Sequence, residues 1–144
     1  MKIYTSNFSS VKNLVKQGIV PIGTVIFPPK WYTGLNYQVL APRPEMLKMS
    51  ETVYVLKYME ILARLKPEVV IQDLVKLGNG KDVALLCFEK PGDFCHRQLV
   101  CKWLNDFLES VGSDVKVSEF VYDPFNVIDP GPSENDLPTQ TSLF

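Results

Sequence analysis

Short apolar runs alternate with amphipathic segments along most of this chain. Runs rich in apolar and β-branched residues predict four strands, over 2–4, 19–27, 82–88 and 115–121. Segments with apolar residues every three to four positions predict helices over 10–17, 50–65, 67–75 and 94–111. This alternation predicts an α/β fold: a small Rossmann-like open sheet of about four mostly parallel strands, with helices on both faces.

Two stretches interrupt the alternation. Pro28 and Pro29 end the second apolar run, and residues 28–49 then carry few helical signals. A loop of this length in a compact domain is usually functional. Residues 124–144 are rich in proline and polar residues and predict an extended or disordered tail. We therefore expect one α/β domain over 1–123, followed by this tail.

The predicted helix over 50–65 illustrates how apolar positions set the expected packing. Apolar residues recur there at helical spacing, with Tyr58 beside them: Val53, Leu56, Met59, Leu62 and Ala63.

Composition narrows the class of protein. Fifteen basic and sixteen acidic residues give a net charge of -1, so no overall charge bias favours nucleic acid or a membrane. No apolar run approaches the roughly 20 residues that span a bilayer. The N-terminus lacks the apolar core of a signal peptide, and three cysteines without an export signal predict reduced thiols. These features predict a cytoplasmic protein with no membrane partner.

The residues best suited to chemistry gather in one segment, between the third predicted strand and the helix that follows it. They are Cys87, Glu89, Lys90, Cys95, His96 and Arg97. In open α/β sheets, ligands bind in the crevice at the carboxyl ends of the strands. The polar exit of the first strand, Thr5, Ser6 and Asn7, reaches the same rim. We therefore expect the site here.

This segment resembles a known family signature. Leu85-Leu86-Cys87-Phe88-Glu89-Lys90, followed by Cys95-His96-Arg97 and a helix, is similar to the motif of domain-of-unknown-function family 488. The resemblance extends over residues 1–123 and implies an α/β fold. It also implies that these cysteines, charged residues and the histidine are the motif positions. The family brings no settled activity.

One interpretation of the segment is an anion or phosphate site. Free N–H groups at a helix N-terminus favour negative charge, and Arg97 adds a forked donor for phosphate. Lys90 would add a positive charge, while Thr5, Ser6 and Asn7 would add neutral donors. An equally weighted alternative is that Arg97 pairs with Glu89 or Asp93 and only clamps the turn.

Two further interpretations use the cysteines. Cys95, at a helix start beside His96, is placed to form a reactive thiolate, whereas Cys87 and Cys101 fit buried structural positions. We expect Cys95 to be the more accessible of the motif cysteines, although an inert thiol is the commoner case. A metal held by Cys87, Cys95 and His96 is disfavoured by their spacing and by the lack of a fourth ligand. We predict no metal and no cofactor.

A last interpretation makes Glu89 the acid, base or nucleophile. Acting on a nucleoside-like ligand, it would need an aromatic partner for stacking, which Trp31 or Tyr32 could supply, while Tyr37 more simply folds the loop over the sheet. The leading hypothesis is a site for a nucleotide-like ligand or phosphorylated nucleic-acid component, with Glu89, His96 and Cys95 as catalytic candidates. Whether the protein is an enzyme stays open. The alternatives are a non-catalytic module binding nucleotide or nucleic acid, and an interaction protein that uses the tail.

Overall fold

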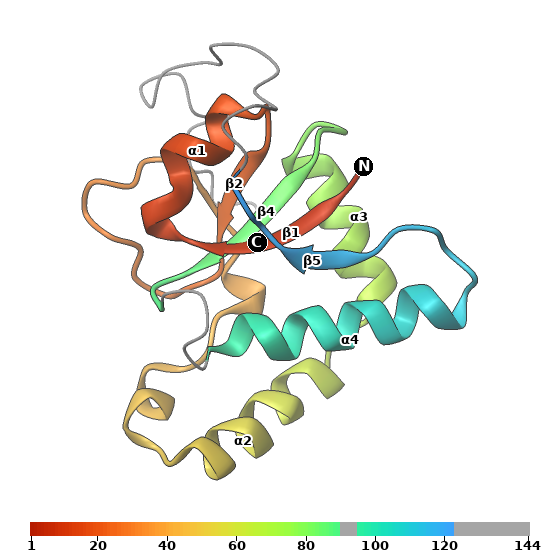
Figure 1. Cartoon of the computed structure of the whole chain (residues 1–144). Helices are drawn as coiled ribbons and strands as arrows, with labels where there is room; N and C mark the ends of the chain where they lie inside the picture. The colour runs from red at the N-terminus through yellow and green to blue at the C-terminus, as the bar shows by residue number, and fades with distance from the viewer. Residues whose placement is uncertain (90–94, 123–144) are drawn as a thin grey trace.

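The computed structural model describes residues 1–89 and 95–122 (Figure 1). Lys90, Asp93 and the predicted tail lie outside the described residues. A five-stranded sheet with strand order β3-β2-β4-β1-β5 forms the centre, and each pair of neighbouring strands is parallel. The strands are β1 (Ile3–Asn7), β2 (Val20–Gly23), β3 (Leu35–Asn36), β4 (Val83–Cys87) and β5 (Val117–Glu119). The predicted α/β fold is confirmed.

The helices connect these strands as the alternation predicted. The α-helices are α1 (Val11–Lys16), α2 (Glu51–Ala63), α3 (Pro67–Leu77) and α4 (His96–Ser110). Three short 3-10 helices are η1 (Phe8–Ser10), η2 (Gln38–Leu40) and η3 (Pro44–Lys48). Among the described residues, no helix is both long enough and apolar enough to span a membrane.

Strand β4 lies at the middle of the sheet and is buried on both faces. Val83 and Leu85 belong to the core under α2, α3 and α4, whereas Ala84 and Leu86 belong to the core under α1. Apolar residues at successive positions suit such a strand, because side chains alternate between faces. Helices therefore cover both faces, as predicted.

The direction of the connections determines where a crevice opens. Helix α1 follows β1 onto one face, and α4 follows β4 onto the other (Figure 1). Strands β1 and β4 are neighbours, and Asn7 lies opposite Cys87 at their carboxyl ends. Neighbouring strands whose helices leave to opposite faces form the switch point where open α/β sheets bind ligands.

The long predicted loop is more ordered than its composition suggested. Strand β2 ends at Gly23 rather than near Phe27, and the unpredicted strand β3 pairs with β2 in register Ile22 to Leu35. Tyr37 is buried, and its hydroxyl donates to Asp73 Oδ2 at 2.5 Å, which anchors the loop to α3. The expectation that Tyr37 folds the loop back is confirmed.

Helix α2 buries a different face from the one its apolar spacing indicated. Tyr54, Tyr58 and Leu62 are buried. Leu62 belongs to the apolar spacing noted in the sequence, but Val53, Leu56 and Met59 of the same set are exposed. The Tyr58 hydroxyl donates to Leu40 O at 2.6 Å, so the tyrosines fix the orientation of the helix. Because apolar residues surround this helix, its spacing alone does not select the buried face.

Candidate functional site

The motif occupies a strand-to-helix junction, as the sequence predicted. Strand β4 ends at Cys87, Cys95 is the N-cap residue of α4, and His96 begins the helix. The Cys95 N–H donates to Gln98 Oε1 at 2.7 Å, one half of a capping box that fixes the first turn.

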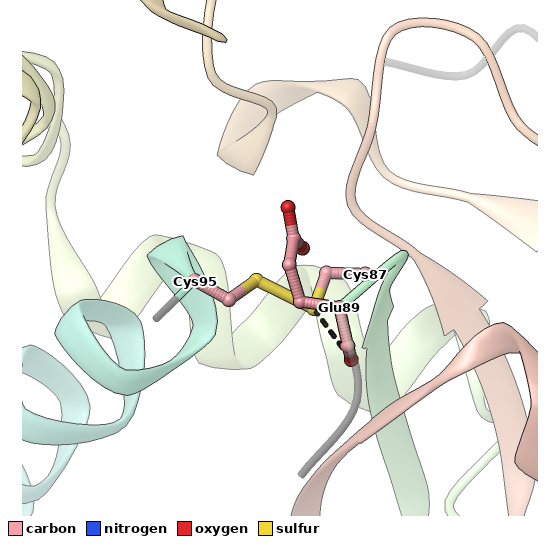
Figure 2. Close-up of side chains that lie close together, drawn as sticks. All are labelled: Cys87, Glu89 and Cys95. Atoms are coloured by element: carbon pink, nitrogen blue, oxygen red, sulfur yellow. Dashed lines mark hydrogen bonds between the residues drawn. A yellow bond between two sulfur atoms is a disulfide. The ribbon is translucent and has the colours of Figure 1, made fainter. Parts of the chain in front are cut away.

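The two motif cysteines form a disulfide (Figure 2). For this pair the structure has the oxidised form rather than the predicted thiols, while Cys101 is a free cysteine. Both sulfurs are shielded from bulk solvent, because Cys87 and Cys95 are 0% and 2% exposed, and of the two only Cys95 lines a cavity among those that the described residues form. The strand end and the helix start turn both side chains inward, which their separation of eight positions does not reveal.

His96 is buried and held by Thr24, the residue after β2. Its Nε2 lies 3.0 Å from Thr24 O and 2.9 Å from Thr24 Oγ1. Burial, with a smaller contribution from the nearby Arg97 charge, lowers the pKa of His96 to about 4. The ring is therefore neutral at neutral pH. Since Thr24 O can only accept, Nε2 carries the proton, and Nδ1 presents a lone pair 3.5 Å from Cys95 Sγ.

Arg97 is buried and bonded to the protein on several sides. Its Nη2 pairs with Glu119 Oε1 at 3.2 Å, and its Nη1 donates to Glu89 O and Cys87 Sγ, each at 2.6 Å. The guanidinium thus ties β5, the end of β4 and α4 together. This geometry favours the clamping role, with the Glu119 carboxylate of β5 and the Glu89 carbonyl as partners.

The predicted neutral donors at the end of β1, Thr5, Ser6 and Asn7, are buried, and two of them, Thr5 and Asn7, bond to protein groups. The Thr5 hydroxyl donates to Glu119 Oε2 at 2.5 Å, and Asn7 Oδ1 accepts from Ser9 and Ser10 at 2.8 and 3.0 Å. The expected role of these residues in holding a ligand does not fit this burial.

The two aromatic candidates for ligand stacking differ in exposure. Trp31 is 57% exposed and borders a hollow beside Phe8 and α1. Tyr32 is 6% exposed, and its hydroxyl donates to Leu35 O at 2.5 Å. Tyr32 therefore belongs to the core, and stacking on a ligand does not fit it. The residues that line the hollow beside Trp31 line neither of the two cavities that contain Glu89.

Glu89 borders two cavities on the α2 side of the sheet, which share Leu47, Tyr54 and Glu89. One cavity, of about 140 Å³, also has His96 in its wall, and the other, of about 280 Å³, has Cys95. Figure 2 shows the Glu89 carboxylate extending away from the two cysteine sulfurs. The three catalytic candidates, Glu89, His96 and Cys95, therefore line two neighbouring cavities.

Sequence reasoning missed two residues of this site. Tyr54 lies in the wall of both cavities, and burial together with the Glu89 charge raises its pKa. Thr24 orients the imidazole of His96. Neither has a local signal, because a tyrosine within an apolar helix and a threonine after a strand are both ordinary positions.

Comparison with known proteins agrees with the motif. Residues 10–107, or 98 of the 144, match the family DUF488-N3a, described as the active DUF488-N3 subclade. The chain belongs to this family. The matched region of this DUF488 protein contains the whole motif and most of α4, and it ends before β5, which supplies Glu119. No curated protein and no solved structure matches the chain.

The donors for a metal in this DUF488 protein differ from those expected. Within the described residues, Cys87 Sγ, a Glu89 carboxylate oxygen and Cys95 Sγ lie within 4.8 Å of one another. His96, a ligand considered from the sequence, is outside this group. The two sulfurs are bonded to each other, and the Arg97 cation contacts Cys87 Sγ. In the disulfide form these donors fit a zinc ion poorly, because zinc requires free thiolates.

We therefore expect the purified DUF488 protein to carry no stoichiometric zinc. Elemental analysis by plasma mass spectrometry, on protein expressed with added zinc, would measure the metal content. About one zinc per chain, lost in Cys95→Ser and retained in Cys101→Ser, would contradict this expectation.

Proposed function

We propose that the protein is an enzyme that acts on a nucleotide-like substrate, with Glu89 as the catalytic carboxylate. The observation that carries this proposal is the position of Glu89, directly after the central strand and at the junction of two cavities. Among the described residues, no side chain bonds to its carboxylate. A carboxylate to which no described side chain bonds, at the switch point of an α/β sheet, is suited to chemistry. The family description as an active subclade also supports an enzyme.

The neighbours of Glu89 suit transfer or hydrolysis at a glycosidic carbon. A carboxylate stabilises the positive charge that develops on the sugar, or attacks it directly. The neutral His96 and the protonated Tyr54 border the same space and add no competing charge. Transition-state charge is best stabilised by groups that are already in place and shielded from water.

The walls of the smaller cavity suit a flat ring. Phe27, Tyr54, Phe88 and two prolines, Pro42 and Pro44, line it. Phe27 and Phe88 are 74% and 55% exposed, an unusual state for large apolar side chains. We assign the base of the substrate to this cavity, since aromatic faces stack on nucleobases.

Basic side chains suited to a phosphate border the next cavity along. A cavity of about 350 Å³ shares Met46 and Met49 with the 280 Å³ cavity, and its charged lining residues are Arg43, Lys57, Arg64, Glu45 and Glu60. Lys57 pairs with Glu60 at 3.9 Å, which leaves the two arginines as the cations best suited to a phosphate. Because Arg97 is engaged with Glu119, we assign the phosphate of the substrate to these exposed cations instead.

A turnover assay tests the proposal. The full-length protein is incubated with nucleosides, nucleotides and short DNA and RNA strands, and products are identified by liquid chromatography with mass spectrometry. We expect cleavage or transfer at the glycosidic bond with wild type and none with Glu89→Gln, which controls for contaminating enzymes. Equal binding by both proteins without turnover would identify a binding module instead. If the protein neither binds nor converts any of these compounds, the proposed substrate class is wrong.

A further inference from the structure

We propose that Cys95 is a site of reversible oxidation by hydroperoxides, and that Cys87 is the thiol that resolves it into the disulfide. In a reducing compartment the two cysteines are then thiols, and the disulfide is the oxidised form. This inference does not depend on the proposed reaction at Glu89. It rests on the different surroundings of the three cysteines.

Cys95 is the thiol that a small oxidant can reach. It is buried from bulk solvent, but it lines the cavity of about 280 Å³, which is wide enough for a peroxide. It caps the N-terminus of the 15-residue helix α4, where the helix dipole favours a thiolate. His96 Nδ1, 3.5 Å from Cys95 Sγ, is placed to take the thiol proton.

Cys87 suits the resolving role. It is 0% exposed, which keeps it from the oxidant, and Arg97 Nη1 contacts its sulfur at 2.6 Å. A guanidinium beside a sulfur favours the thiolate. The Glu89 carboxylate, within 4.8 Å of both sulfurs, opposes this effect, but the arginine cation is closer to Cys87.

The chemistry balances with a hydroperoxide as the oxidant. The Cys95 thiolate attacks one peroxide oxygen, the O–O bond breaks, and Cys95 becomes a sulfenic acid while the leaving oxygen takes a proton. The Cys87 thiolate then attacks the Cys95 sulfur and releases water after a second protonation. With hydrogen peroxide, two thiols lose two electrons in total and the oxidant becomes two waters. Glu89 lies in the segment that the new bond closes.

Cys101 is an internal control on the same helix. Its thiol donates to Val117 O at 3.4 Å, and burial together with the Glu119 charge raises its pKa. It is a free cysteine in the structure. We therefore expect Cys101 to stay a thiol under conditions that oxidise the pair.

Counting thiols tests the proposal on the full chain. Protein reduced with dithiothreitol and freed of it is treated with hydrogen peroxide, denatured, alkylated with N-ethylmaleimide and mapped by mass spectrometry. We expect labels on all three cysteines before oxidation and on Cys101 alone afterwards. Oxidation should be at least about tenfold faster in the native protein than in urea, because the fold raises the thiolate fraction.

Two variants separate the roles of the cysteines. Cys87→Ser should stop at a Cys95 sulfenic acid, which dimedone traps, whereas Cys101→Ser should form the disulfide as wild type does. Retention of all three labels in oxidised wild type would overturn the proposal. So would equal rates in native and denatured protein, or a Cys95→Ser variant that dimedone labels on Cys87 while Cys87→Ser takes no label on Cys95.

Discussion

Glu89→Gln is expected to lower turnover by about 10²- to 10⁴-fold while leaving the free energy of unfolding within about 0.5 kcal/mol of wild type. The amide keeps the size of the side chain and removes its charge and its ability to exchange a proton. Stability should barely change, because no described side chain bonds to the carboxylate; Arg97 and Cys87 contact the Glu89 carbonyl instead. The measurements are the product assay and urea unfolding.

Glu109→Gln is the matched control for this variant. Glu109 lies on the exposed last turn of α4, away from both cavities, so the same chemical change there should affect neither turnover nor stability. A Glu89→Gln protein with full turnover would remove Glu89 from the chemistry. A variant that loses several kcal/mol would show instead that the carboxylate supports the fold.

Local sequence pattern was enough to predict the junction that carries the site. The short apolar run at Val83–Cys87, followed by a Pro-Gly pair in the sequence, favours a buried strand, and the apolar stripe after His96 predicts α4. Once the strands are parallel, their carboxyl ends meet at one edge of the sheet. Placing Glu89, Cys95 and His96 together therefore required only local periodicity and the general rule for α/β sheets.

The partners of these residues could not be predicted in the same way. Arg97 pairs with Glu119 on β5, 22 positions later, because β5 lies beside β1 in the sheet. Thr24 reaches His96 across 72 positions for a similar reason. A single sequence contains no signal for such long-range pairs, and nearby Glu89 and Asp93 were the natural partners to expect for Arg97.

The cavity walls depended on packing that local spacing does not determine. Helix α2 is apolar around much of its circumference, and the hydroxyl bond from Tyr58 to Leu40 selects the face that packs inward. The same choice brings Tyr54 to Glu89 and leaves Leu56 exposed. A wrong prediction of which face of α2 is buried therefore also gives a wrong prediction of which side chains line the site.

Arg97→Met is expected to lower the free energy of unfolding by about 3 kcal/mol, toward the lower end of the cost of breaking a buried ion pair. Methionine fills part of the space but supplies no donors to Glu119, Glu89 O or Cys87 Sγ. The side chain of Glu119 is 36% exposed, so water can partly solvate it after the loss of the arginine. In a thermal melt this change corresponds to a decrease in Tm of roughly 10 °C.

Lys102→Met on the same helix is the matched control, because it removes an equal charge from a surface pair. Lys102 and Asp106 are 2.8 Å apart, but their side chains are 75% and 63% exposed, so the loss of stability should be far smaller than for Arg97→Met. Arg97→Lys should fall between the two, since lysine keeps the charge and loses the fork that reaches β4 and β5 together. If Arg97→Met melted like wild type but lost binding to phosphate-bearing ligands, the anion-site interpretation would replace the clamp. A large loss of stability confined to Arg97→Met would instead place this arginine among the groups that hold β4, β5 and α4 around Glu89.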